Sequence, residues 1–380
     1  MILDVCTYLI VFMVAIFLAF IYQKYCNRIA ITSPIGNIDS DGYILNCLMG
    51  CVFLTPIIVM YGMRYGIGTD YFSYEQIYDI LHDTSFADYW FNHNDGVGVY
   101  YVEPFYYLLN VVMPSYRILQ WCLGVIIYSL LCTALKEYYG KINFAYALFI
   151  YLSTQFIYSM NGTRFSIAIC FLLLAYIFLA KGRGIRFVQF VLLASMFHTS
   201  ALFCLPIYLL KEYRGDFANK IRNIGIIFFI ILFPLIVEYL FEFAASIAVF
   251  ARYFLAYSIN SKTDGGFMWI IHIIPVILPL VFFCRKEIFY STDTSVYFRI
   301  CLMEVPFRIL GHYNMWFARY ARCSQIILVI LIPLILSRIR NRYKKLLLEL
   351  YYIIWYIFYF AYYAMVNDQG ASLPYTWIFS

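Results

Sequence analysis

Long apolar runs recur along this chain, and they limit its fold more than any other feature. Hydrophobic residues make up 64% of the 380 positions and charged residues 13%, whereas a soluble domain is near half apolar and a quarter charged. Runs of about 18 residues or more are long enough to cross a bilayer as α-helices. Alternating segments of about ten residues, typical of barrel strands, do not occur. The sequence therefore predicts an all-α, polytopic integral membrane protein.

We predict about 10–12 transmembrane helices in a single membrane-embedded domain that covers residues 1–380. The first run, Val5 to Phe20, is expected to be a retained helix rather than a signal peptide. No basic residue precedes it, and no small-residue cleavage site follows it. The predicted spans are roughly 5–23, 43–63, 116–135, 143–160, 164–180, 187–210, 222–241, 267–284, 295–313, 318–337 and 346–366.

The basic residues of short loops predict which side of the membrane each loop occupies. If residues 187–210 crossed the membrane, the strongest basic cluster, residues 338–345, would lie on the outer side. The polar residues 198–200, His-Thr-Ser, interrupt that run. A re-entrant pair of half-length helices, broken near His198, would return the chain to the same side and place every basic cluster inside. With that arrangement the outer side holds two loops, at residues 64–102 and 242–266.

Five arginines are expected near the outer membrane face. An arginine inside a membrane helix costs about 2.5–3.5 kcal/mol on insertion scales, so it usually has a partner or a ligand. Each side chain can instead extend to the interface and keep its charge in water. A cluster of guanidinium groups would suit a phosphate or pyrophosphate, because each group donates paired hydrogen bonds and keeps its charge. The five are Arg64, Arg164, Arg252, Arg319 and Arg322.

Arg164 and His198 have the most specific sequence contexts. Arg164 follows Asn161-Gly162-Thr163, a pattern typical of a helix start. A helix N-terminus offers free N–H groups and positive potential to a phosphate; alternatively, Asn161 or Thr163 only caps the helix. His198 lies at the predicted helix break and would act as an acid or base near neutral pH. The alternative is that His198 is a hydrogen-bonded core residue.

Asp70 and Glu103 are the acids nearest the membrane on the outer side. A proline follows Glu103 at a position favoured in the first turn of a helix. Either carboxylate would orient an arginine or accept a proton from an attacking hydroxyl. Tyrosines of the same loop, Tyr71 and Tyr74 among them, offer rings that can stack on sugars.

The sequence holds no glycine-rich nucleotide loop, no serine-hydrolase motif and no zinc-ligand spacing. The 11 cysteines are an odd number and lie mostly inside apolar runs, so we expect buried hydrophobes rather than disulfides or metal ligands. The net charge of +6 is spread over loops and does not indicate nucleic-acid binding. We expect no metal and no cofactor, so an activated substrate would supply the energy of any reaction.

The stretch RYGIGTDYFSYEQIY at residues 64–78 contains an arginine, then GTDY, then a further tyrosine. QFIYSMNGTRFSIAICFLLLAY, followed by FVLLASMFHTSALF, pairs a helix-opening arginine with a segment that ends in histidine and a small polar residue. Together with ARYFLAY and WFARYARCSQ, these stretches resemble the EpsG family, which belongs with the Wzy-type polysaccharide polymerases. The resemblance covers about residues 60–335. The family's usual glutamine before the helix-opening arginine is replaced here by Asn161-Gly162-Thr163.

The resemblance implies a bacterial inner-membrane enzyme of O-antigen or exopolysaccharide biosynthesis. Such polymerases transfer a growing glycan from undecaprenyl pyrophosphate onto the next lipid-linked repeat unit, on the periplasmic face. Arg64 and Asp70 match the first motif of the family, and Arg164 and His198 match the second. The implied partners are undecaprenyl-pyrophosphate-linked oligosaccharide, membrane lipid and a protein that regulates chain length, with no nucleic acid.

On this hypothesis the chain is a glycosyltransferase-like polymerase, and three other functions stay open. An O-antigen ligase uses the same donor and is expected to carry its larger outer loop late in the chain. A flippase or transporter would need polar residues near the membrane midplane, and a scaffold would tolerate single arginine changes. The predicted catalytic residues are His198, Glu103 and Asp70. The predicted substrate-binding residues are Arg64, Arg164, Arg252, Arg319, Arg322, Tyr71 and Tyr74.

Overall fold

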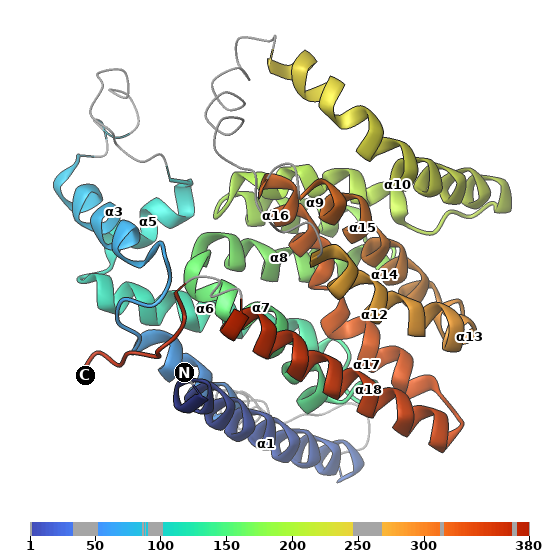
Figure 1. Ribbon diagram of the computed structural model, residues 1–380, viewed down its shortest axis with the longest axis horizontal. Helices are drawn as coiled ribbons and strands as arrows, with labels where there is room; N and C mark the ends of the chain where they lie inside the picture. Colours follow the sequence, from blue (N-terminus) through green and yellow to red (C-terminus); the bar gives the residue numbers. More distant parts are fainter. Residues whose placement is uncertain are drawn as a thin grey trace. The chain divides into compact units, whose positions relative to one another are not determined.

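The structure is a computed structural model, and it describes residues 2–32, 52–85, 87, 89, 102–245, 268–311, 315–366 and 371–379. These residues form helices joined by turns (Figure 1). The only pairing of extended backbone that they contain is a single bridge between Arg64 and Trp377. The predicted all-α class is therefore confirmed.

Five helices among the described residues are long and apolar enough to cross a membrane. They are Val5–Tyr25, Tyr116–Lys136, Thr163–Ala180, Phe317–Arg338 and Arg342–Ala364. Shorter apolar helices cover Val52–Gly62, Gly184–Ser195, Thr199–Leu210 and Ile273–Phe283. The chain is thus a polytopic integral membrane protein, as the apolar runs predict.

The chain divides into two compact units. The first comprises Met1–Leu174, Phe190–Leu202 and Ile353–Ser380. The second comprises Ala175–Gln189 and Phe203–Tyr352. The predicted site residues therefore fall into two sets, because the early arginines belong to the first unit and the late ones to the second.

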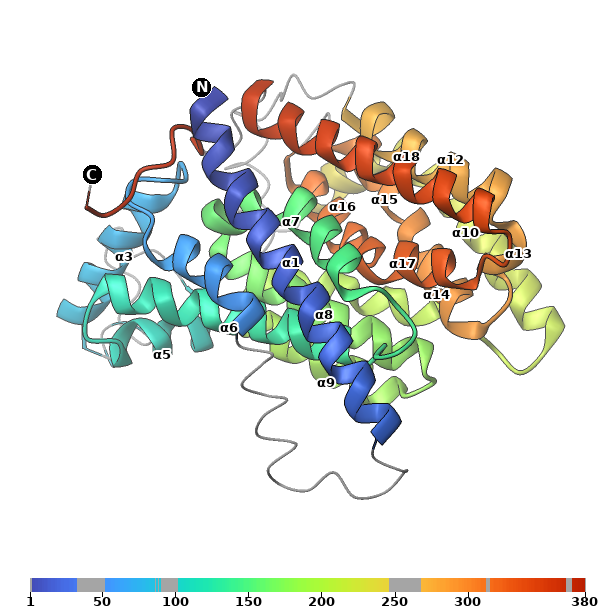
Figure 2. The same ribbon diagram turned by 90° about the horizontal axis from the view of Figure 1, so that it is seen from below.

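The first unit contains both ends of the chain. In it, α1 (Ile2–Thr32) packs along α7 (Phe144–Asn161), and Figure 2 shows the two helices side by side. The buried Tyr8 ring of α1 meets Phe156 of α7 edge-to-face, with ring centroids 6.1 Å apart. The remaining elements are the helix Val52–Gly62, α3 (Tyr71–Asp83), α5 (Pro104–Val112), α6 (Tyr116–Lys136), most of α8 (Thr163–Ala180), the end of α18 (Arg342–Ala361) and η2 (Tyr362–Val366).

The second unit packs its helices around α15 (Glu304–Leu310). α15 contacts α10 (Asp216–Ala245) on one side and α16 (Met315–Gln325) on another. Rings of Phe233 and Phe307 pack against buried Leu310 at this junction. The other elements are α12 (Met268–Phe283), α13 (Arg285–Ile288), α14 (Thr292–Leu302), α17 (Leu328–Arg338) and the start of α18.

Most predicted spans coincide with helices of the structure, but two of them are divided. The span 295–313 is interrupted at Met303, between α14 and α15. Pro306 lacks a backbone N–H, and its ring crowds the carbonyl four residues earlier, so the helix breaks before it and Pro306 lies in the first turn of α15. The span 318–337 is divided between α16 and α17, where Ile330 N–H bonds to Ile327 O at 3.0 Å in the tighter 3₁₀ spacing.

One helix, α3, occupies part of the segment 64–102, which we predicted only as an outer loop. It contacts α5, which begins just after that segment (Figure 1). α3 is amphipathic, because its apolar and aromatic residues recur at the helical period along one face. That buried face consists of Tyr71, Tyr74, Ile77, Tyr78 and Leu81. Residues 90–101, most of the predicted loop 242–266 and Arg252 lie outside the described residues.

Residues 184–210 form a hairpin of two short helices, as the polar break at His198 predicts. α9 (Gly184–Ser195) and the 3₁₀ helix η1 (Thr199–Leu210) have 12 residues each. At rises of about 1.5 and 2.0 Å per residue, neither helix covers a hydrocarbon core about 30 Å thick. The two ends of the segment meet, because a Cβ placed on Gly184 would lie 2.7 Å from the Tyr208 ring. The predicted break near His198 is confirmed, whereas the return of the chain to the same side of the membrane stays a prediction.

Candidate functional site

Arg164 and Glu103 form an ion pair in the first unit. Arg164 is the second residue of α8, and Glu103 is the residue before Pro104, which opens α5. Arg164 Nη1 donates to Glu103 Oε2 at 2.8 Å. Glu103 is only 6% exposed, so its charge requires a partner. Two predicted site residues are thus brought together by the starts of two helices.

The second carboxylate oxygen of Glu103 holds the tip of the 184–210 hairpin. Glu103 Oε1 accepts a hydrogen bond from the Thr199 backbone N–H at 3.1 Å. The first turn of α5 adds a second link, because Phe105 N–H donates to Met196 O at 3.0 Å. Glu103 therefore contacts Arg164 and the hairpin tip at the same time. The sequence suggested a carboxylate that orients an arginine, but not the contact with the hairpin tip.

His198 occupies the turn at that tip. Its Nδ1 lies 2.6 Å from Ser200 Oγ, and its ring packs against Phe165, with centroids 5.0 Å apart. Phe165 directly follows Arg164, so His198 and Arg164 adjoin the same first turn of α8. The contact with Ser200 orients the imidazole, and the tautomer of His198 determines which of the two groups donates.

Two tyrosine rings flank the Arg164 guanidinium. Its central carbon lies 5.8 Å from the Tyr74 ring centroid and 5.4 Å from that of Tyr106, within cation–π range. Burial raises the pKa of both hydroxyls, and the positive charge of Arg164 opposes that rise only in part. Both therefore stay protonated donors. Tyr106 was not among the predicted residues, although it lies one helical turn after Glu103 and so shares its face of α5.

The loop of the RYGIGTDY motif docks against the junction between α7 and α8. Asn161 Oδ1 accepts hydrogen bonds from Thr69 Oγ1 at 2.9 Å and from the Asp70 N–H at 3.0 Å. Gly68 has a φ of +106°, and a Cβ on it would lie 3.0 Å from Met160 O. Asn161 thus ties this loop down three residues before Arg164. The sequence suggested only a helix cap for it.

Arg64 lies in the interior of the first unit. Its side chain donates to Tyr61 O at 2.9 Å and stacks on the Tyr61 ring at 3.9 Å, and only 2% of it is exposed. The C-terminal residues cover it, since Tyr65 N–H bonds to Thr376 O and Ile378 N–H to Met63 O, each at 3.0 Å. Substrate binding by Arg64 stays a prediction. In the structure, its guanidinium group lies where it supports the loop of the RYGIGTDY motif.

The exposed aromatic residues of this loop are not the two tyrosines that the sequence predicted to bind sugars. Tyr71 and Tyr74 are both buried by α3, so their stacking on sugars stays a prediction. Tyr65 and Phe72 are instead 47% and 51% exposed, and their rings meet edge-to-face at 6.1 Å. Asp70 is exposed beside them. The difference arises because α3 packs with Tyr71 and Tyr74 inward and Phe72 outward.

The late arginines lie on α16 in the second unit. Arg319 is half-buried and Arg322 is buried, and the two are one helical turn apart. Arg252, the fifth predicted arginine, lies outside the described residues. Among the described residues, no three His, Cys, Asp or Glu side chains gather in a way that could hold a metal ion.

A family model described as the EpsG family matches residues 47–377. The match spans most of the chain and includes the RYGIGTDY loop, Glu103, Arg164 and His198. The chain belongs to the EpsG family. EpsG proteins are membrane proteins similar to Wzy-type polymerases, so this EpsG protein is a membrane protein of polysaccharide biosynthesis. Comparison with curated proteins and with solved structures gave no match to either.

Proposed function

We propose that this EpsG protein is a polysaccharide polymerase that joins undecaprenyl-pyrophosphate-linked oligosaccharide repeat units. The observation that carries the proposal is the constellation of Arg164, Glu103 and His198 at the meeting point of α5, α8 and the hairpin tip. It combines a fixed positive charge with a polarised imidazole, which are the two groups that glycan transfer from a pyrophosphate requires. We place the protein in the bacterial inner membrane, with this constellation facing the periplasm.

Arg164 would bind the pyrophosphate of the donor. A guanidinium keeps its charge and can donate two parallel hydrogen bonds to a phosphate. Glu103 uses one oxygen for Arg164 and the other for Thr199, which favours a positioning role over a role as the base. Donor binding by Arg319 and Arg322, which lie in the later family-like segment WFARYARCSQ, stays a prediction from the sequence.

His198 would act as the base. In the reaction, the acceptor hydroxyl oxygen attacks the anomeric carbon of the donor glycan while the bond from that carbon to the pyrophosphate breaks. The electron pair leaves with undecaprenyl pyrophosphate, whose new charge Arg164 stabilises, and the hydroxyl proton passes to His198. The activated donor supplies the free energy. Asp70 is the alternative base, because it is exposed at the edge of the same loop.

The glycan would contact the exposed aromatic pair Tyr65 and Phe72. Their accessible rings adjoin the RYGIGTDY loop, which Asn161 ties to the start of α8. Aromatic faces can pack against sugar rings without needing a particular charge. The water-soluble part of the substrate would then lie beside the constellation while its lipid stays in the bilayer.

The deciding experiment is the size distribution of surface polysaccharide on a gel, from cells that carry wild-type protein, Arg164→Ala or no gene. We expect Arg164→Ala to reduce a ladder to a single-repeat band at an unchanged protein level. Arg117→Ala is the matched control, because Arg117 is an exposed arginine at the start of α6. It should leave the ladder intact.

The other functions give different patterns in the same cells. A ligase would leave long lipid-linked chains inside the envelope, and a flippase would leave single lipid-linked units on the cytoplasmic face. A normal ladder in the Arg164→Ala strain would remove Arg164 from the site. Asp70→Asn and His198→Asn, assayed side by side, decide between the two candidate bases.

A further inference from the structure

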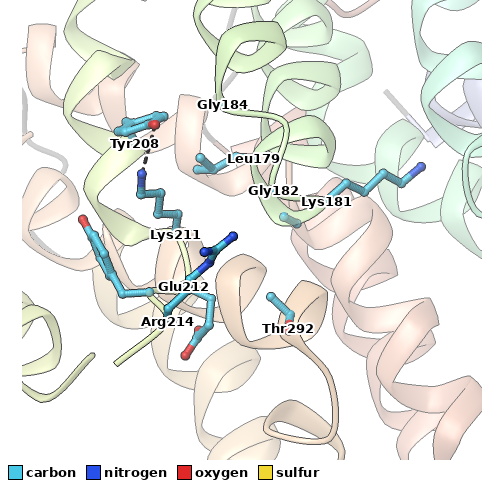
Figure 3. Close-up of a pocket in the computed structure, with 11 residues that line it drawn as sticks. Leu179, Lys181, Gly182, Gly184, Tyr208, Lys211, Glu212, Arg214 and Thr292 are labelled. Carbon is cyan, nitrogen blue, oxygen red and sulfur yellow. Dashed lines mark hydrogen bonds between the residues drawn. The ribbon is translucent and has the colours of Figure 1, made fainter. Parts of the chain in front are cut away.

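A cavity of about 570 Å³ lies at the base of the 184–210 hairpin, within the second unit (Figure 3). This volume falls in the range of small-molecule sites, about 300–1,000 Å³. Its walls come from the end of α8, the turn into α9 and the end of η1 with the segment that follows. The lining residues used below are Gly184, Tyr208, Lys211, Glu212 and Arg214.

The cavity carries excess positive charge. Lys211 and Arg214 line it (Figure 3), and neither is paired with a carboxylate in the described part of the chain. The only carboxylate among the lining residues belongs to Glu212. Two arginines from outside the lining already neutralise it, Arg299 at 2.6 Å and Arg222 at 3.3 Å. An entering anion would therefore meet uncompensated cations.

Lys211 is held in place by tyrosines. Its Nζ donates to Tyr208 Oη at 2.9 Å, the bond drawn in Figure 3, and it lies 4.1 Å from the Tyr208 ring centroid. The Tyr213 ring centroid is 5.4 Å away. These contacts orient the ammonium group and leave donor capacity for a ligand, because an ammonium group has three N–H donors.

Backbone hydrogen bonds at the end of α8 fix one wall of the cavity. Gly182 has a φ of +72° and follows α8, with its N–H bonded to Leu179 O at 3.0 Å and Arg183 N–H bonded to Phe178 O at 2.8 Å. Gly184 then allows Tyr208 to approach more closely than any side chain would permit. Gly184 thus brings α9 and η1 together beside the cavity.

The cavity also lies where apolar helices end. The candidate span Thr163–Ala180 stops at its wall, and both apolar arms of the hairpin end there. Such ends are where lipid phosphates meet cationic side chains. The distribution of Lys and Arg predicts that this is the cytoplasmic side.

We propose that Lys211 and Arg214 form a phosphate-binding site in this cavity, separate from the constellation around Arg164. The ligand is a phosphate group, carried either by the head group of an anionic lipid or by a small soluble phosphate. The two sources share the same recognition chemistry, which is paired donors from guanidinium and ammonium to phosphate oxygens.

The test uses the purified full chain and native mass spectrometry with phosphatidylglycerol against phosphatidylcholine. A parallel arm titrates inorganic phosphate and pyrophosphate and follows the thermal unfolding temperature. The variant is Lys211→Gln/Arg214→Gln. The matched control, Arg183→Gln/Lys286→Gln, removes the same charges from exposed residues that do not line the cavity.

We expect the cavity variant to bind at least about tenfold more weakly, because it loses two charged hydrogen-bond donors. The control should bind like wild type. Loss in the phosphatidylglycerol arm identifies a lipid, and loss in the pyrophosphate arm identifies a soluble ligand. Equal binding by cavity variant and wild type, or equal loss in both variants, would overturn the proposal. Arg214→Gln alone repeats the test at an exposed residue, where misfolding is not expected.

Discussion

Arg164 Nη1 and Glu103 Oε2 are 2.8 Å apart, although 61 positions separate the two residues in the sequence. Their contact joins the first turn of α8 to the start of α5. Glu103 also accepts a hydrogen bond from Thr199 N–H, so one buried carboxylate connects three segments that are far apart in the sequence. Changes at this carboxylate should therefore affect stability and activity together.

Glu103→Gln should lower the free energy of unfolding by about 1–3 kcal/mol, because Arg164 loses its counter-charge while remaining largely buried. The amide oxygen still accepts from Thr199, so the hairpin tip should stay attached. Thermal unfolding of the purified protein measures the loss. Glu75→Gln, on the half-exposed side of α3, is the control and should change little. Equal stability of Glu103→Gln and wild type would show that the ion pair contributes nothing to the fold.

Gly68→Ala should destabilise the protein more than Gly140→Ala does. Both glycines have positive φ, +106° and +71°, and a residue with a Cβ is strained there by about 1–3 kcal/mol. Only Gly68 adds a close contact, because its new Cβ would lie 3.0 Å from Met160 O, whereas open space surrounds Gly140. The difference between the two unfolding temperatures measures this contact together with the strain of a φ of +106°, which lies farther from the left-handed helical region than +71° does. Equal losses would mean that the RYGIGTDY loop does not depend on its approach to Met160.

His198→Asn should reduce polymerisation about 10²–10⁴-fold, the usual contribution of a general base. Wild-type activity should fall in acid, because a base must be unprotonated to accept a proton. Polymer formed from purified lipid-linked repeat units, assayed across pH, measures both effects. A pH profile that keeps its acid limb in His198→Asn would assign the base elsewhere, with Asp70 the next residue to test.

Ser200→Ala should reduce polymerisation less than His198→Asn does. The Ser200 hydroxyl lies 2.6 Å from His198 Nδ1 and orients the imidazole, but in the proposed reaction it does not itself accept the proton. The same assay measures both rates. A loss as large as that of His198→Asn would show that Ser200 does more than orient the ring.

Asp293→Asn should destabilise the second unit at neutral pH and much less in acid. Partial burial raises the pKa of Asp293, but the Ser291 hydroxyl and the Arg338 guanidinium at 3.2 Å outweigh it, so the pKa lies below its ordinary value. Its stabilisation is present above the ordinary aspartate range, about 3.9, and is lost as pH falls through the depressed pKa. Unfolding temperatures of wild type and variant should converge on acidification. Asp83→Asn, an exposed control, should show no such convergence.

The local features of this protein follow from short stretches of sequence. The long apolar runs predict the spans, Pro104 marks the first turn of α5, and the residues before Arg164 predict a helix start. The polar residues at 198–200 predict the break of the hairpin. Each of these features depends on the helical repeat or on one residue's backbone preference. A short stretch of sequence is enough to show either.

Tertiary packing sets the environment of each candidate side chain. The sequence predicts Arg64 at the outer face, yet the C-terminal residues cover it. It predicts Tyr74 as a loop tyrosine, yet this ring packs beside Arg164. The reason is physical: helix periodicity reports which residues share a face, but not which distant segment covers that face. Short-range patterns therefore specify the helical membrane class and the break at His198, while packing between distant segments brings Glu103, Arg164 and Thr199 together.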